Sequence, residues 1–262
     1  MKILAIDSSG LAASVAVVED DCLIAEYTTN YKKTHSQTLL PMLDEVRKMI
    51  ELDLPSIDAI AVAAGPGSFT GLRIGSATAK GLGFALDKPL IGVPTVDALA
   101  MNLYGTQDIV CPIMDARRNQ VYTGVYTFEP MQTDGYRTSF RLHTLKPQCV
   151  VPIETITEQL NHLSRPGNVI FLGDGVPVFG ERLEALMERP FSLAPATQNR
   201  QRAGAVALLA FEYAAQGWMQ PAWQHVPEYL RPSQAERQRE EAKEKFGEQE
   251  ADQRIRKGLT SC

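Results

Sequence analysis

Apolar and polar residues along the first hundred positions follow two different periods. Short apolar or alternating segments predict five strands, at 2–8, 12–19, 22–30, 57–64 and 89–93. Apolar residues at helical spacing predict two helices, at 36–51 and 70–86. Pro41 fits the first helix only near its first turn, because proline lacks the backbone N–H that later turns need. The buried stripe of that helix is predicted to consist of Leu39, Met42, Leu43, Val46, Met49 and Ile50.

A similar order of elements begins near residue 109. Strands are predicted at 109–115, 120–128, 140–150 and 168–172, and helices at 153–163, 177–187 and 202–216. The strands that end in Asp7 and Asp115 occupy the same place in each half. The pattern therefore predicts an α/β protein made of a duplicated unit, with a seam between 95 and 108. We expect an N-terminal domain at 1–104, a C-terminal domain at 105–231 and a charged tail at 232–262.

The tail differs from the rest of the chain in composition. It is rich in Glu, Gln, Lys and Arg and holds few large apolar residues. The favourable i,i+4 pair Glu241/Lys245 stands beside the unfavourable pair Glu240/Glu244. We expect a frayed helix or a disordered, solvated tail.

Composition and charge limit the classes of protein to which this chain can belong. A chain of 262 residues, 44% hydrophobic and 22% charged, is typical of a soluble globular protein with an ample core. Its net charge of −5 gives no general attraction to nucleic acid. Asp7 interrupts the first apolar run at once, unlike a signal peptide, and no run reaches the roughly 18 apolar residues of a membrane span. The cysteines form no C-x-x-C pair, which is typical of a reducing cytoplasm without structural zinc.

A glycine-rich turn joins the strand at 57–64 to the helix at 70–86. Such a turn can bind phosphate through free backbone N–H groups. The Walker A lysine is absent, however, the G-x-G-x-x-G spacing fails by one residue, and Pro66 removes a donor. Phosphate binding is therefore the weaker interpretation. The residues of this motif are Gly65, Pro66, Gly67, Ser68, Phe69, Thr70, Gly71 and Leu72.

The helix at 70–86 carries more apolar and small residues than one sheet can cover. Its polar positions, Arg73, Ser76, Lys80 and the following Asp87, form one narrow stripe. Small residues at 71, 75, 79 and 83 recur at steps of four, which lets another backbone approach closely. Glycine inside a helix costs about 1 kcal/mol relative to alanine, so a geometric requirement is expected. We predict that this helix packs on a second body; the alternative is burial within the chain's own fold.

Two further positions could carry chemistry. Asp7 and Asp115, at equivalent strand ends, would face the nucleotide cleft in a sugar-kinase or actin-type fold, or form ordinary Asx turns. The turn after Asp115 lacks the glycines that bring backbone close to phosphate. His35 has Leu39, not a second histidine, at i+4, so a capping or surface role is favoured over a metal site.

Four segments together resemble the TsaB family, also called YeaZ. They are Met1 to Ser9, the run His35-Ser36-Gln37-Thr38-Leu39-Leu40-Pro41, the glycine-rich segment 65–75, and Val226-Pro227-Glu228-Tyr229-Leu230-Arg231. The glycine-rich segment is the most specific of them. The resemblance covers residues 1 to 231 and leaves out the tail.

The resemblance implies an actin/sugar-kinase/Hsp70-like (ASKHA) fold of two domains, each a mixed sheet flanked by helices. It also implies dimerisation through the helices at 36–51 and 70–86. In the catalytic relative TsaD a histidine pair at i and i+4 holds a metal; His35 matches the first histidine and Leu39 replaces the second. A weak nucleotide cleft would comprise Asp7, Ser8, Ser9 and Asp115. The implied interface residues are Leu39, Leu40, Leu43, Val46, Arg73, Ile74, Gly75, Ala77, Lys80, Gly81 and Phe84.

The implied function is that of a non-catalytic dimerisation and activating subunit. It would pair with TsaD in the synthesis of N6-threonylcarbamoyladenosine at tRNA position 37 (t6A37) in the cytoplasm, with TsaE and TsaC in the wider pathway. The chain would meet tRNA only through the complex, form a homodimer when alone, and need no membrane, metal or cofactor of its own. ATP/ADP and Mg would bind only weakly or in the assembled complex. The alternative is a glycoprotease-like metallopeptidase or an ATPase of the same fold.

Overall fold

The computed structural model describes residues 1–20, 22–131 and 138–231. The chain divides into two units, Met1–Glu228 and Tyr229–Cys262, and the helices and strands below belong to the first. The predicted tail at 232–262 lies outside the described residues. Within them, no helix has the length and apolar character needed to cross a membrane.

The first half of the chain forms a five-stranded mixed sheet of order β3-β2-β1-β4-β5. β1 pairs antiparallel with β2 and parallel with β4, with Ala5 opposite Ala16 on one side and Ala61 on the other. The predicted order of three strands, helix, strand, helix, strand is confirmed. The elements are β1 (Lys2–Asp7), β2 (Ala13–Glu19), β3 (Cys22–Thr29), α1 (His35–Met49), η1 (Leu54–Ser56), β4 (Ala59–Gly65), α2 (Phe69–Leu86) and β5 (Leu90–Pro94).

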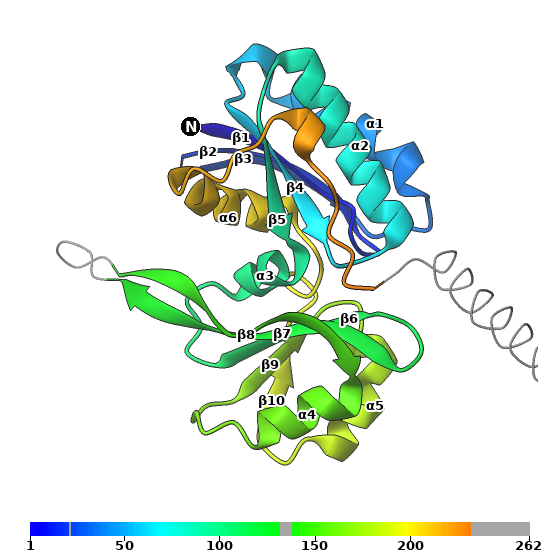
Figure 1. Ribbon diagram of the computed structural model, residues 1–262, viewed down its shortest axis with the longest axis vertical. Helices are drawn as coiled ribbons and strands as arrows, with labels where there is room; N and C mark the ends of the chain where they lie inside the picture. The colour runs from blue at the N-terminus through cyan, green and yellow to red at the C-terminus, as the bar shows by residue number, and fades with distance from the viewer. Residues whose placement is uncertain (21, 132–137, 232–262) are drawn as a thin grey trace, which may run out of the picture. The chain divides into compact units, whose positions relative to one another are not determined.

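Helices α1 and α2 cover one face of this sheet (Figure 1). Alternate strand residues such as Leu4, Ile60 and Val62 form a buried cluster with the inner side of α1. Two predictions for α1 were wrong. Pro41 lies inside the helix, beyond its first turn, and Met49 is 76% exposed rather than part of the buried stripe. With 3.6 residues per turn, the apolar stripe rotates slowly around the axis of α1, so Met49 at the end of the helix points away from the sheet.

The second half repeats the arrangement. Its sheet has the order β10-β9-β6-β7-β8, which matches the first sheet strand for strand when read from β8. The predicted duplication and the fold of two mixed sheets flanked by helices are therefore confirmed. α3, η2 and β10 were not predicted, because they are too short to show a period. The elements are α3 (Thr95–Ala100), η2 (Met101–Leu103), β6 (Ile109–Asp115), β7 (Gln120–Met131), β8 (Ser139–Pro152), α4 (Ile153–Asn161), β9 (Val169–Leu172), α5 (Val176–Leu186) and β10 (Phe191–Leu193).

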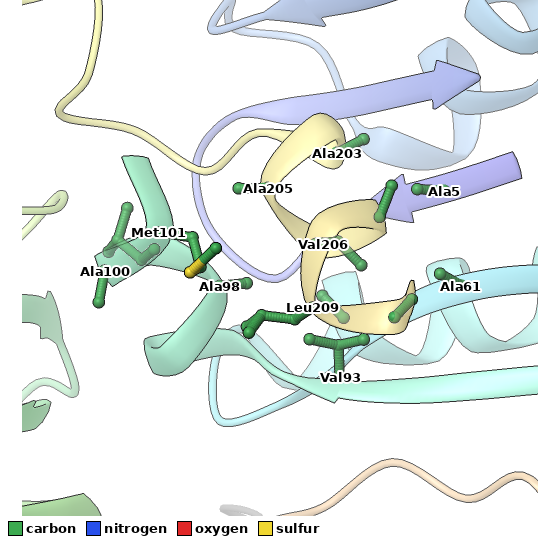
Figure 2. Close-up of a cluster of buried hydrophobic side chains, with 14 of the residues drawn as sticks. Ala5, Ala61, Val93, Ala98, Ala100, Met101, Ala203, Ala205, Val206 and Leu209 are labelled. Carbon is green, nitrogen blue, oxygen red and sulfur yellow. The ribbon is translucent and has the colours of Figure 1, made fainter. Parts of the chain in front are cut away.

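The chain returns to the first sheet after β10. Helix α6 (Ala203–Ala215) packs against β1 and β2, on the face opposite α1 and α2 (Figure 1). In Figure 2, Val206 and Leu209 of α6 lie beside small side chains on the strands, such as Ala5 and Ala61. The sequence pattern placed α6 in the domain 105–231, with the second sheet. α6 is apolar on nearly all sides, so the spacing of its apolar residues does not indicate which of the two sheets it covers.

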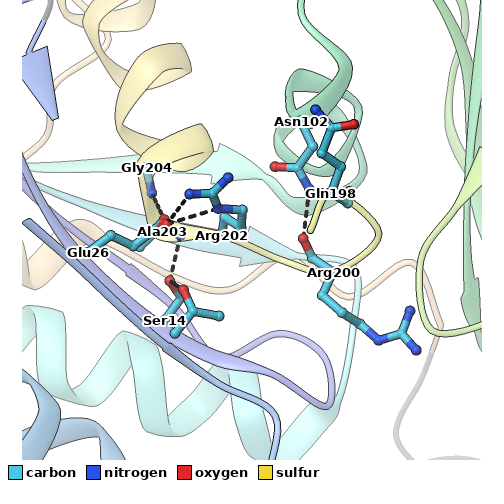
Figure 3. Close-up of polar contacts among 9 residues, drawn as sticks. Ser14, Glu26, Asn102, Gln198, Arg200, Arg202, Ala203 and Gly204 are labelled. Carbon is cyan, nitrogen blue, oxygen red and sulfur yellow. Dashed lines mark hydrogen bonds and ion pairs between the residues drawn. The ribbon is translucent and has the colours of Figure 1, made fainter. Parts of the chain in front are cut away.

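Polar contacts fix the beginning of α6 on the first sheet (Figure 3). The Glu26 carboxylate accepts hydrogen bonds from Arg202 Nε and from the backbone N–H of Gly204, both at 2.9 Å. Ser14 Oγ accepts the backbone N–H of Ala203, also at 2.9 Å. These acceptors satisfy N–H groups that have no partner inside the helix, and the carboxylate lies at the positive end of the helix dipole. These contacts join Ser14 of β2 and Glu26 of β3 to residues 202–204 at the start of α6.

Candidate functional site

The glycine-rich turn between β4 and α2 packs closely on the turn that follows β1. The backbone N–H of Ser68 donates to the carbonyl O of Ser9 at 2.7 Å. Ser68 Oγ accepts the N–H of Gly71 at 3.3 Å and so caps α2. A Cβ added to Gly67 would lie 2.3 Å from the Ser9 carbonyl O. These two N–H groups at the start of α2 are therefore engaged within the chain.

The stripe of small residues at 71, 75, 79 and 83 faces inward, not toward a second body. A Cβ on Gly71 would lie 2.1 Å from the Ser8 carbonyl O, and one on Gly75 would lie 2.4 Å from Ser8 Oγ. Ala79 is fully buried, and a Cβ on Gly83 would lie 2.8 Å from the Cβ of Ala222. The prediction that this stripe admits a partner backbone was wrong. The close approach that it permits is to the chain's own turns.

A different side of α2 is open to solvent. Arg73, Ala77, Gly81 and Phe84 are exposed there, and the Phe84 side chain keeps 64% of its accessible surface. Gly81 differs from the three inward glycines in having no atom within 4 Å of an added Cβ. The guanidinium carbon of Arg73 lies 3.9 Å from the centre of the Phe69 ring, a cation–π contact. On α1, Leu40 is 55% exposed.

The predicted interface residues thus fall into three groups. Leu40, Arg73, Ala77, Gly81 and Phe84 are exposed, and together they define what we call the outer helix face. Ile74 and Lys80 are half-buried. Leu39, Leu43, Val46 and Gly75 are buried in the chain's own core, so they are not available as contact residues on this surface.

The residues of the predicted weak nucleotide cleft lie in two local clusters. Asp7 is fully buried, and its Oδ1 accepts the N–H of Ser9 at 2.9 Å and Ser9 Oγ at 2.6 Å. Burial raises the pKa of the Asp7 carboxyl to about 6, against the opposing effect of the Ser9 hydrogen bonds. Ser8 Oγ donates to the Gly71 carbonyl O at 2.9 Å. This first cluster therefore joins the end of β1 to α2.

The second cluster surrounds Asp115. Its carboxylate accepts the N–H of Arg117 at 2.7 Å and pairs with the Arg117 guanidinium at 3.0 Å. Asp174 Oδ1 accepts the Asp115 N–H at 3.2 Å, and burial raises the pKa of Asp174. Asp174, which lies between Gly173 and Gly175, was not among the predicted cleft residues. Nucleotide binding at either cluster stays a prediction.

One polar residue of the region, Gln201, was missed from sequence, and the contact made by His35 was not predicted. Gln201 is buried against Gly10, where an added Cβ would lie 2.5 Å from Gln201 Nε2. Within the described part of the chain, neither amide atom of Gln201 has a hydrogen-bond partner. His35 Nε2 donates to the Gly10 carbonyl O at 2.9 Å, so this histidine holds a turn rather than capping α1. No local sequence signal pairs residues this far apart along the chain.

The described residues contain no group of three or more His, Cys, Asp or Glu side chains placed to hold a metal ion. Leu39, which stands at i+4 from His35, is buried in the core under α1. The position that a second histidine would need is therefore occupied by a packing residue.

Comparison with known proteins identifies the family. The family model described as "TsaD: tRNA N6-adenosine threonylcarbamoyltransferase" matches residues 22–238. The tRNA threonylcarbamoyladenosine biosynthesis protein TsaB of Bacillus subtilis is 34% identical over 90% of this chain and 96% of its own length. The protein of the same description from Escherichia coli is 33% identical over 67% of this chain and 72% of its own.

A solved structure supports the same assignment. YeaZ from Pseudomonas aeruginosa superposes with a TM-score of 0.68 at 29% identity, covering 87% of this chain and 99% of its own. The identity, the coverage and the shared fold agree over both halves of the chain, as the four sequence segments predicted. The chain belongs to the TsaB (YeaZ) family of tRNA threonylcarbamoyladenosine biosynthesis proteins.

Proposed function

We propose that the chain acts in t6A37 synthesis as a non-catalytic subunit that pairs with a TsaD-type threonylcarbamoyltransferase through the outer helix face. The observation that carries the proposal is the exposure of Leu40 and Phe84 on two adjoining helices whose inner sides are fully buried. Aromatic and aliphatic side chains held in solvent by ordered helices are typical of protein interfaces. Family membership supports the pathway, and the outer helix face supports the binding role.

The proposal assigns the chain no catalysis of its own. His35 is engaged with the Gly10 carbonyl, and Leu39 stands where a second histidine would have to be. The polar groups at the end of β1 hydrogen-bond to one another and to α2. These contacts fit a scaffold that presents a rigid face to its partner. Alone, the chain forms a homodimer through the same face.

Replacing Ala77 by glutamate tests the proposal. Ala77 is exposed at the middle of α2, and glutamate is a good helix former, so the fold should be unaffected. A desolvated charge at the centre of the interface should weaken binding to the purified TsaD-type protein of the same organism by about 100-fold or more. Isothermal titration calorimetry measures this change. Sedimentation should show the isolated chain shifting from dimer to monomer.

Val178→Glu supplies the matched control. Val178 is exposed on α5, which flanks the second sheet, so the same charge is added away from the outer helix face. This variant should bind like the wild type. If Ala77→Glu also bound like the wild type, the outer helix face would not be the partner-binding surface and the proposal would fail.

A further inference from the structure

Segment 218–226 exposes an unusual set of large apolar side chains. Trp218, Met219, Trp223 and Val226 are all exposed. The sequence contains only two tryptophans, and they are 62% and 63% exposed at positions 218 and 223. Tryptophan has a large apolar surface and is enriched among residues that dominate binding energy. The two exposed tryptophans are therefore the first candidates for contact residues in this segment.

The backbone of Trp223 is held against α2. It lies in the short helix η3 (Ala222–Gln224), and Lys80 Nζ of α2 donates to the carbonyl O atoms of Trp223 at 3.3 Å and His225 at 3.1 Å. Ala222 is buried and fills the space left by the absent side chain of Gly83. Trp223 is therefore presented from an ordered position, which lowers the entropy lost on binding.

The position of η3 makes it a neighbour of the outer helix face. Successive residues of α2 are about 100° apart around the helix axis. Gly83 and Lys80 contact η3, and Phe84 comes next to them around the axis. Ala77 and Gly81 follow Phe84, farther from η3. α1 contacts α2 as well, and Leu82 joins the buried cluster that the two helices share. The exposed surface of α2 thus lies between α1 and η3, and η3, which carries Trp223, adjoins it on the side of Lys80 and Gly83.

Trp218 is tied to different elements. Its ring lies 5.1 Å from that of Tyr213 near the end of α6, and its backbone N–H donates to the Tyr213 carbonyl O at 2.9 Å. It lines a hollow of about 370 Å³ at the edge of β5, together with Met219 and His225. The two tryptophans are therefore equally exposed but only Trp223 adjoins α2 through described contacts.

We infer that Trp223 is an anchor residue of the partner-binding surface, which comprises α1, α2 and η3 rather than the two helices alone. The inference rests on the proposed function. The occupant is the TsaD-type partner, whose apolar helix surface would cover Phe84 and Trp223 together. The continuity of Trp223 with the outer helix face favours this occupant. The open position at Gly81 gives room for a close approach.

The test compares single alanine variants in the full-length chain. Trp223→Ala should raise the Kd for the purified TsaD-type protein at least tenfold, while Trp223→Phe should stay within about threefold of the wild type. Trp218→Ala, equal in exposure and in the size of the truncation, should stay within about twofold. Circular dichroism of all three variants should show the wild-type fold, because both side chains are mostly in solvent.

Each outcome separates this inference from the function on which it rests. If Trp223→Ala binds like the wild type while Ala77→Glu does not bind, Trp223 is not an anchor and the helix-face function stands. If Trp218→Ala weakens binding as much as Trp223→Ala, the loss is a general apolar effect and the inference also fails. If Ala77→Glu binds normally, the proposed function itself is wrong.

Discussion

Replacing Gly71 by alanine is expected to lower the free energy of unfolding by about 3 kcal/mol, the upper part of the range for overpacking. The new Cβ would lie 2.1 Å from the backbone carbonyl O of Ser8. Neither group can move easily, because Ser8 Oγ also donates to the Gly71 carbonyl O and the turn is buried. Urea unfolding followed by circular dichroism measures the change.

The same substitution at Gly81, later in the same helix, is the control. A Cβ at this position meets no atom within 4 Å, so only helix propensity changes. Alanine is favoured over glycine there by about 1 kcal/mol, so Gly81→Ala should raise the free energy of unfolding. Equal effects of the two substitutions would show that close packing on the Ser8 turn is not the reason for Gly71.

Asp7→Asn is expected to stabilise the protein at neutral pH and to have little effect in acid. Burial raises the pKa of the Asp7 carboxyl from 3.8 to about 6. Since the folded pKa is the higher one, the native state holds the proton more tightly than the unfolded chain. The contribution of Asp7 to stability is therefore fully present below about pH 4 and is lost as the pH rises through 6. The difference between a pKa of 3.8 and one of about 6 corresponds to about 3 kcal/mol.

Asparagine at position 7 carries no charge and keeps an Oδ1 acceptor for both hydrogen bonds from Ser9. The free energy of unfolding of Asp7→Asn at pH 7.5 should exceed that of the wild type by about 2–3 kcal/mol, and the two should converge near pH 4. Asp44→Asn should behave in the opposite sense, because Lys48 and Arg47 lower the pKa of that carboxyl. Equal stability of Asp7→Asn and wild type at both pH values would contradict the prediction.

Local patterns were sufficient for the elements that are long or strongly periodic. The strand ending in Asp7, its counterpart ending in Asp115 and the helix after the glycine-rich turn were all predicted close to their observed bounds. Alternation and helical spacing are properties of neighbouring residues, so no tertiary information is needed to read them. α3 and β10 were missed because six and three residues do not establish a period.

The candidate site was predicted only in part. Of the predicted interface residues, Leu40, Arg73, Ala77, Gly81 and Phe84 are exposed on the two helices, whereas Leu39, Leu43, Val46 and Gly75 proved to be core residues. An amphipathic helix has an apolar side that packs on the core, and an interface helix has a second apolar side that contacts a partner. The composition of a helix does not show which apolar residues belong to which side. Trp223 was missed because its relation to α2 depends on a contact between residues more than a hundred positions apart.

The sequence by itself determined the family, the duplicated α/β order and the presence of a helix with unusual glycines, because motifs and periods are local. Tertiary structure alone decided what those glycines do. Gly71, Gly75 and Gly83 face the chain's own turns, whereas Gly81 faces solvent. The same residue type has opposite roles on the two sides of α2, since the role depends on which distant segments fold back against each side.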